Sequence, residues 1–183
     1  MSKLLYIHGF ASCGRGQKSA VLADFFGNKA VLAPDLPSSP VEAVRLLSSL
    51  LDKEDIGLLV GSSLGGYYAG YLAEKYAMKA VLVNPSIQPY ETLSSYVGIQ
   101  ERFCDKQLFM FEADDLEALK TFGSKPVYGE YLVLLQSGDE VLDYTKAKKY
   151  YENQRVVVEY GGNHRFENIE DYLSMIGNFK NGK

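Results

Sequence analysis

A Gly-Ser-Ser-Leu-Gly segment in the first half of the chain could support nucleophilic chemistry. Only Ser63 fits the central position of a G-x-S-x-G pattern, with Gly61 and Gly65 on either side. A serine hydroxyl becomes an effective nucleophile when a sharp strand-to-helix turn lifts it clear of its neighbours and sets it beside a base. Flanking glycines permit the close backbone contacts of such a turn. The pattern predicts Ser63 as a nucleophile, with a structural turn or a phosphate-binding turn as the alternatives.

The base for Ser63 must be one of the two histidines of the chain, His8 or His164. His164 lies in a glycine-rich loop after the last apolar run, and such a loop can bring an imidazole over the edge of a sheet. His8 directly follows the first apolar run and precedes Gly9, which is typical of a residue that shapes a loop by hydrogen bonding. We predict His164 as the base, against the alternative of a surface histidine, and His8 and Gly9 as loop-shaping residues.

A carboxylate is needed to orient the base and to stabilise the imidazolium that forms when the base takes a proton. Asp139 lies in a glycine turn that follows the apolar run 131–136. Asp143 is the alternative, but it is better placed as the N-cap of a helix that begins at Tyr144. Glu140 is the third candidate. We predict Asp139 as the acid.

The tetrahedral intermediate of acyl transfer needs two backbone N–H donors for its oxyanion. One would be the N–H of Leu64, the residue after the predicted nucleophile and the first of a helix. The other would come from the loop after the first apolar run, where Phe10 is the candidate. The predicted site therefore draws on loops that are far apart in the sequence.

Short apolar runs alternate with helical patterns along most of the chain, as expected for strands buried on both faces of a parallel sheet. The predicted strands cover residues 4–7, 30–33, 56–60, 80–83, 131–136 and 156–159, and the predicted helices cover about 19–26, 40–51, 64–76, 143–151 and 167–179. This order predicts an α/β fold: a mostly parallel sheet of about six strands with helices on both faces. The predicted nucleophile, acid and base each follow a strand, so they would meet at the carboxyl edge of the sheet.

The strand and helix alternation breaks between Asn84 and Gly129. This segment carries the large apolar side chains Tyr90, Tyr96, Phe103, Phe109, Met110, Phe111 and Phe122, and a helical stretch over 114–121. So many apolar side chains are not expected to stay in water, so some would pack on the sheet and others would face a substrate. We predict a single domain over residues 1–183 with a lid-like insertion at 84–129.

Composition excludes several classes of function. The 183 residues are 46% hydrophobic and 23% charged, with a net charge of −4, which describes a globular protein. There is no basic run for nucleic acid, no apolar run long enough to span a membrane and no signal-peptide pattern, so a cytoplasmic location is expected. Cys13 and Cys104 form no metal motif and are expected to be free thiols, with no metal site. The oligomeric state stays open.

The order of the predicted residues, Ser63, Asp139 and His164, is that of the α/β-hydrolases. The sequence resembles this superfamily over nearly its whole length, and within it a group of small bacterial serine esterases. The motifs that carry the resemblance are Tyr6-Ile7-His8-Gly9-Phe10, Gly61-Ser62-Ser63-Leu64-Gly65-Gly66-Tyr67-Tyr68, Asn84-Pro85, Gly138-Asp139-Glu140-Val141-Leu142 and Gly161-Gly162-Asn163-His164. Two early strands of larger members are absent, so the resemblance implies a compact α/β-hydrolase fold.

The resemblance implies a serine hydrolase that forms an acyl-enzyme on Ser63, with Asp139 as acid, His164 as base and Phe10 and Leu64 as oxyanion donors. The implied substrates are small molecules: short-chain carboxylic esters and, as a second class, acyl-CoA thioesters. No cofactor is implied. The alternatives are C–C bond hydrolysis, elimination or acyl transfer by the same triad, and a non-catalytic binding protein that keeps the fold.

Candidate substrate contacts lie near the predicted site in the sequence. Arg15 follows the donor loop and Arg165 follows His164, so either could receive an anionic group, with a solvated loop arginine as the alternative. Tyr67 lies one turn into the helix after the nucleophile, and Tyr90 lies in the insertion. A tyrosine at helical spacing is also typical of ordinary packing, so this alternative stays open.

Overall fold

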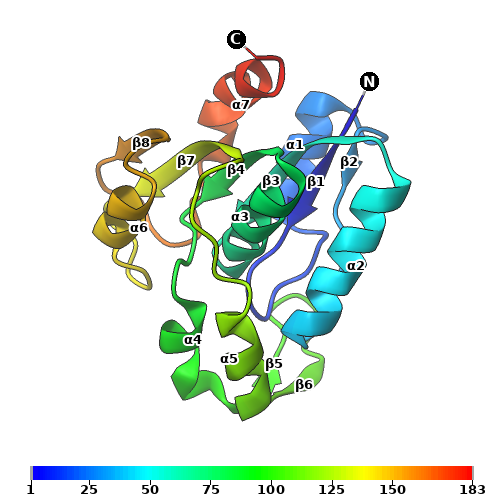
Figure 1. The fold of residues 1–183 in the computed structure, drawn as a ribbon, viewed down its shortest axis with the longest axis vertical. Coiled ribbons are helices and arrows are strands. Elements are labelled where there is room, and N and C mark those ends of the chain that lie inside the picture. The colour runs from blue at the N-terminus through cyan, green and yellow to red at the C-terminus, as the bar shows by residue number, and fades with distance from the viewer. Residues whose placement is uncertain (1, 183) are drawn as a thin grey trace.

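Six strands form the central sheet of the protein, whose structure is a computed structural model that describes residues 2–182 (Figure 1). The strands, in their order across the sheet, are β2 (Val31–Leu32), β1 (Lys3–Ile7), β3 (Ile56–Ser62), β4 (Lys79–Val83), β7 (Glu130–Gln136) and β8 (Arg155–Glu159). Every neighbouring pair in this sheet is parallel. The predicted α/β fold with a parallel six-stranded sheet is confirmed.

Helices cover both faces of the sheet because alternate strand residues enter two separate apolar layers. Leu5 and Leu59 join a layer under α2 (Pro40–Lys53), α3 (Leu64–Tyr76) and α6 (Tyr144–Tyr150). Leu4 and Leu58 join the opposite layer, under α1 (Gln17–Phe26), the 3-10 helix Ile169–Tyr172 and α7 (Leu173–Lys180). Within residues 2–182, no helix has both the length and the apolar character needed to cross a membrane.

The observed elements differ from the predicted ones mainly at the edges of the fold. The strand expected at 30–33 contains only Val31 and Leu32, since it lies at the sheet edge and pairs with β1 alone. The helix expected at 167–179 begins as a 3-10 turn at Ile169 and becomes α-helical only from Leu173. Neither change moves the carboxyl ends of the central strands.

The strand order creates a crevice between β1 and β3. From β1 the chain passes to β2 on one side and then returns to β3 on the other side of β1. The connections that leave the carboxyl ends of β1 and β3 therefore run in opposite directions, and ligands of open α/β sheets bind at such a point. The residues that follow these two strands are His8 and Ser63.

The insertion at 84–129 is built from short elements. These are α4 (Pro89–Thr92), a 3-10 helix (Ser94–Tyr96), an antiparallel hairpin of β5 (Gly98–Glu101) and β6 (Leu108–Phe111), and α5 (Ala113–Lys120). Figure 1 shows α4, α5 and the hairpin gathered at the end of the molecule opposite both termini. The arrowhead of β1 points toward this end, so the insertion faces the carboxyl edge of the sheet.

The hairpin was not predicted, because β6 contains only apolar residues and so lacks the alternation of apolar and polar residues that identifies a half-buried strand. In Leu108–Phe111 all four residues are apolar, yet Leu108 and Met110 are 63% and 50% exposed while Phe111 is 1% exposed. Phe103, in the hairpin turn, is 71% exposed. The expectation that the large apolar side chains of the insertion avoid water is therefore wrong for part of the set.

Cys13 and Cys104 form a disulfide, which corrects the expectation of free thiols. Their Cα atoms lie 6.2 Å apart although the two cysteines are 91 positions apart in the sequence. The bond joins the loop after β1 to the turn between β5 and β6, and the Phe103 N–H donates to the Ala11 carbonyl beside it at 2.8 Å. Within residues 2–182, the one group of side chains spaced to hold a metal ion is these two cysteines with Asp105, and the disulfide uses both sulfurs.

Candidate active site

Ser63 occupies a strained turn between β3 and α3. Its φ of 55° and ψ of −120° lie outside the ordinary regions for a non-glycine residue, and such strain is typical of functional sites. A Cβ at Gly65 would collide with the carbonyl oxygen of Ile7, and a Cβ at Gly61 would collide with that of Gly65. The two glycines therefore let the turn lie directly against β1, which holds the serine hydroxyl at the crevice.

The side chains of Ser63, His164 and Asp139 form one chain of hydrogen bonds. Nε2 of His164 lies 3.0 Å from Oγ of Ser63, and Nδ1 lies 2.8 and 3.0 Å from the two carboxylate oxygens of Asp139. A carboxylate at Nδ1 holds the proton there, which leaves Nε2 free to accept the serine proton. The tertiary structure thus brings together three residues that are spread over 101 positions of the sequence.

The other acidic candidates lie elsewhere. Asp143 caps α6, where its side chain accepts a hydrogen bond from the Thr145 N–H at 3.0 Å. The Glu140 carboxylate accepts the backbone N–H of His164 at 2.9 Å, and this bond holds the pKa of Glu140 below its ordinary value. Of these three carboxylates, that of Asp139 is the one within hydrogen-bond distance of the imidazole ring, and its side chain is 2% exposed against 20% for that of His164.

Two buried polar residues hold the loop that carries His164. Asn84, at the end of β4, donates from Nδ2 to the carbonyl of Asn163 at 3.0 Å and accepts the Gln136 N–H on Oδ1 at 2.9 Å. Gln136, the last residue of β7, accepts the Asn163 N–H on its side chain at 2.9 Å. Both side chains are 2% exposed. Neither residue was predicted to have a role, although a glutamine at the end of an apolar strand is a signal that could have indicated one.

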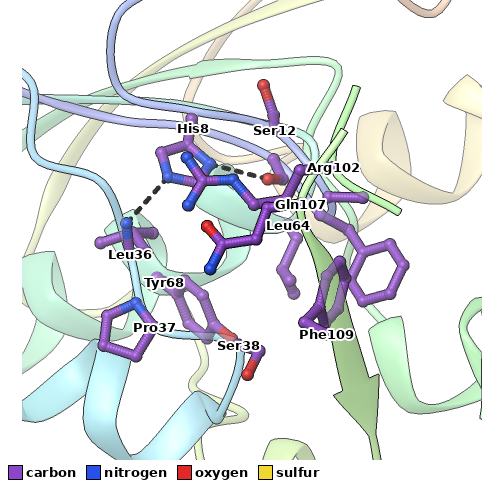
Figure 2. A pocket seen from close by; sticks show the side chains of 13 residues that line it. His8, Ser12, Leu36, Pro37, Ser38, Leu64, Tyr68, Arg102, Gln107 and Phe109 are labelled. Atoms are coloured by element: carbon purple, nitrogen blue, oxygen red, sulfur yellow. Dashed lines mark hydrogen bonds between the residues drawn. The ribbon is translucent and has the colours of Figure 1, made fainter. Parts of the chain in front are cut away.

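His8 joins the loop after β1 to the loop after β2. Its Nε2 accepts the Leu36 N–H at 3.0 Å, so Nδ1 carries the proton and donates to the Gly9 carbonyl at 2.9 Å (Figure 2). Burial lowers the pKa of His8, which keeps the ring neutral in this arrangement. This position suits the predicted loop-shaping role, and it separates His8 from the side chains of Ser63 and Asp139.

The two residues predicted as oxyanion donors are Leu64, which follows Ser63 directly, and Phe10, in the loop that approaches Ser63. Leu64 is the first residue of α3, so its N–H has no acceptor within the helix. Within residues 2–182, no backbone carbonyl accepts the Phe10 N–H. A Cβ built on Gly9 would lie 3.7 Å from Oγ of Ser63, which shows how closely the loop after β1 approaches the serine. Both N–H groups are therefore available to an anion formed over Ser63.

A cavity of about 230 Å³ opens beside these two donors (Figure 2). It lies between the loop after β1, the loop after β2, the first turns of α3 and the hairpin of the insertion. The four predicted substrate contacts, Arg15, Tyr67, Tyr90 and Arg165, do not line it. Tyr68, Arg102, Gln107 and Phe109 line it instead, and the first three were not predicted as substrate contacts.

Tyr67 and the two arginines have other surroundings. The Tyr67 hydroxyl donates to the carbonyl of Leu119 in α5 at 2.6 Å, which ties α3 to the insertion. Arg15 lies at a second hollow beside the disulfide, and Arg165 is exposed. The face of α3 that carries Tyr68 lies toward the cavity, whereas Tyr67 lies toward α5.

The family of the chain follows from a match to a family model over residues 3–181. The model is described as Uncharacterised protein family (UPF0227). The chain belongs to this family. A UPF0227 protein of Citrobacter koseri is 27% identical over 185 residues, which cover 97% of this chain and 98% of that relative.

Solved structures identify the fold of this UPF0227 protein as that of the α/β-hydrolases. Est1E from Butyrivibrio proteoclasticus, with ferulic acid bound, superposes with a TM-score of 0.74 at 14% identity and covers 100% of this chain and 90% of its own. The esterase domain of a Rhodothermus marinus protein superposes with a TM-score of 0.69 at 18% identity, covering 96% and 83%. At these identities the likeness concerns the fold alone, and it confirms the α/β-hydrolase fold that the sequence resemblance implies.

Proposed function

We propose that this UPF0227 protein is a serine hydrolase that cleaves carboxylic esters and thioesters of short acyl groups through an acyl-enzyme on Ser63. The observation that carries the proposal is the hydrogen-bonded chain from Ser63 through His164 to Asp139, set at a strained turn beside two unpaired backbone N–H groups. This arrangement supplies a nucleophile, a base, an acid and an oxyanion site within one crevice.

In the first half of the reaction, Oγ of Ser63 attacks the carbonyl carbon of the substrate while its proton passes to Nε2 of His164. The carbonyl oxygen becomes an oxyanion, which the N–H groups of Phe10 and Leu64 stabilise. Asp139 stabilises the imidazolium. The intermediate then collapses: the bond to the leaving oxygen or sulfur breaks, His164 returns the proton to it, and Ser63 keeps the acyl group.

In the second half, a water molecule attacks the acyl-enzyme. Its proton passes to Nε2 of His164, its oxygen joins the acyl carbon, and the same two N–H groups hold the new oxyanion. Collapse of this intermediate returns the proton to Oγ of Ser63 and releases the carboxylic acid. Every step uses groups of the chain itself and water.

The size of the cavity supports a short acyl group. At about 230 Å³, it lies below the range of roughly 300–1,000 Å³ that is typical of sites for drug-sized ligands. The structural neighbours include Est1E, which was solved with ferulic acid bound, and an esterase domain, and both are consistent with ester substrates here.

A fluorophosphonate probe tests the proposal directly, because it reacts only with an activated serine. We expect one adduct, on the peptide that contains Ser63, and loss of both labelling and 4-nitrophenyl butyrate hydrolysis in Ser63→Ala. Ser62→Ala is the matched control, since Ser62 is the neighbouring serine and does not contact His164. Labelling of Ser62, or unchanged hydrolysis in Ser63→Ala, would overturn the assignment.

The same experiment separates the alternatives. A non-catalytic binding protein would give neither an adduct nor hydrolysis. An acyl transferase would give the Ser63 adduct, but product would form only when an acceptor alcohol or thiol is added. Release of free acid in water alone supports hydrolysis.

A further inference from the structure

The cavity beside the oxyanion donors lies on the acyl side of the nucleophile. Because His164 must protonate the leaving group, that group has to lie next to Nε2 of His164. The cavity is lined by Phe10 and Leu64, the two residues predicted as oxyanion donors, whereas Ser63, His164 and Asp139 do not line it. A substrate whose carbonyl oxygen points at the two donors therefore directs its acyl group into this cavity.

The walls of the cavity combine apolar side chains with one buried hydroxyl. Leu36, Leu64 and Phe109 supply apolar surface. Tyr68 is 2% exposed, yet it lines the cavity, and Figure 2 shows its ring directed into the space beside Ser38. Among the hydrogen bonds of residues 2–182, none involves the Tyr68 hydroxyl, whereas that of its neighbour Tyr67 donates to Leu119. The Tyr68 hydroxyl is not among the fully enclosed polar atoms that lack a partner, so it faces the open space of the cavity, where a ligand can bond to it.

The Tyr68 hydroxyl is available as a donor. Burial raises its pKa, so the phenol stays protonated throughout the range in which an esterase is assayed. The side-chain amide of Gln107 reaches the same space from the hairpin, between Arg102 and Tyr68 in Figure 2. Tyr68, Gln107 and Arg102 therefore give the cavity a polar end, in addition to the apolar surface of Leu36, Leu64 and Phe109.

The charge at this polar end is compensated. The Arg102 guanidinium lies 3.4 Å from the Asp35 carboxylate and 3.3 Å from that of Asp105. One cation beside two carboxylates leaves no net positive charge to attract an anionic substrate group. The chemistry of the polar end therefore favours an uncharged hydrogen-bond acceptor over a carboxylate.

We propose that the cavity binds the acyl group of the substrate and that this acyl group carries an uncharged oxygen that accepts a hydrogen bond from Tyr68. The oxygen can belong to an ether, a hydroxyl or a carbonyl group. This inference rests on the proposed esterase function and names its substrate class: short acyl esters oxygenated away from the scissile bond. Tyr68 is the specificity-determining residue.

The test uses 4-nitrophenyl esters that differ only by one oxygen in the acyl chain. Hexanoate is compared with 4-methoxybutanoate and 3-ethoxypropanoate, in which an oxygen replaces the fifth or the fourth chain carbon. Each kcat/KM is divided by the rate of spontaneous hydrolysis of the same ester, which removes differences in intrinsic reactivity. We expect at least one oxygenated ester to exceed hexanoate by about five- to tenfold, the kinetic value of one neutral hydrogen bond.

Two matched variants assign the preference to one hydroxyl. Tyr68→Phe keeps the buried ring and removes a hydroxyl that has no partner in the protein, so we expect the preference to fall to near one while the melting temperature stays about the same. Tyr67→Phe removes the neighbouring hydroxyl, which donates to Leu119. We expect it to keep the preference and to lower the melting temperature by about 2–4 °C, as for the loss of one buried hydrogen bond.

Several results would overturn the inference. Equal normalised rates for all three esters would mean that the cavity does not recognise an acyl oxygen. A preference that survives in Tyr68→Phe would assign recognition to another group. A preference for monoethyl adipate over ethyl hexanoate, followed by acid release, would mean that the site binds a carboxylate. If no ester is cleaved, or if Ser63→Ala cleaves them equally well, it is the proposed function that fails.

Discussion

The carboxylate of Asp139 lies 2.8 Å from Nδ1 of His164, while Asp143, four residues further on, turns away to cap α6. Two aspartates that look alike in the sequence therefore have different surroundings. The Asp139 side chain is 2% exposed and accepts the N–H groups of Val141 and Leu142 in addition to the imidazole. Those bonds keep the carboxylate aimed at the ring.

The two aspartates should respond differently to substitution. Asp139→Asn removes the charge that stabilises the imidazolium, and we expect kcat for 4-nitrophenyl butyrate to fall by about 10²–10⁴-fold. Asp143→Ala removes the helix cap, and we expect it to lower the free energy of unfolding by about 1 kcal/mol while kcat is retained. Steady-state kinetics and urea unfolding on both variants check this. Comparable losses of kcat in the two variants would contradict the assignment of Asp139.

Acidification should destabilise the fold through His8. Burial is the main cause that lowers its pKa, outweighing the hydrogen bond to Gly9 and the Asp35 charge, which raise it. The unfolded chain therefore binds a proton more readily than the folded protein. Below the ordinary histidine pKa of about 6.5, unfolding takes up a proton. The free energy of unfolding therefore decreases as the pH is lowered, by at most about 1.4 kcal/mol per pH unit.

Urea unfolding of wild type and of His8→Gln between about pH 7.5 and 5 measures this contribution. We expect a shallower pH dependence in the variant, because glutamine does not titrate. The carboxylates with lowered pKa values, such as Asp35, act only at lower pH and do not affect this window. Identical slopes in the two proteins would show that His8 does not titrate on unfolding.

The disulfide between Cys13 and Cys104 should stabilise the protein by closing a long loop of the unfolded chain. With the cysteines 91 positions apart in the sequence, we expect Cys104→Ser to lower the free energy of unfolding by about 2–4 kcal/mol. Dithiothreitol should destabilise wild type by a similar amount and leave Cys104→Ser unchanged, which separates the bond from the substitution itself. Insensitivity of wild type to the reductant would argue against the bond.

Phe109 should set how much acyl chain the cavity accepts. It lines the cavity and packs edge-on against Phe10, with ring centroids 5.7 Å apart. Phe109→Ala should therefore shift the preference toward longer 4-nitrophenyl esters, since each methylene in an apolar pocket is worth about 1–3 kcal/mol of discrimination. Phe103→Ala is the control, because Phe103 belongs to the same hairpin turn region and is 71% exposed. An unchanged chain-length profile in Phe109→Ala would mean that the pocket wall lies elsewhere.

The turn at Ser63 could be predicted because its requirements are local. A serine in this turn needs a small residue two positions before it and another two positions after it. Gly61 and Gly65 meet that requirement, and it can be recognised without knowing the rest of the sheet. The same holds for the strands: burial on both faces makes each one a short continuous apolar run, which is visible without knowledge of its neighbours. His164 and Asp139 could be placed because each follows such a run.

The substrate contacts could not be predicted in this way. Tyr67 and Tyr68 are adjacent tyrosines in the same helix, and nothing in their sequence tells which one faces a cavity. The direction of α3 relative to the hairpin decides which tyrosine faces the cavity. The Tyr67 hydroxyl donates to the Leu119 carbonyl, and Tyr68 lines the cavity. Arg102 and Gln107 reach that space only because the insertion folds back over the carboxyl edge of the sheet.

The sequence by itself therefore determined the sheet, the strained turn at Ser63 and the identity of the acid and base to be tested, because local sterics and burial leave a signature within a few residues. Only the tertiary structure decided the disulfide between Cys13 and Cys104, the polar network around the His164 loop and the unpaired hydroxyl of Tyr68. These features depend on contacts between segments that are tens of residues apart in the sequence. The rest of the fold decides whether a side chain in such a segment forms a bond, is buried or faces a cavity.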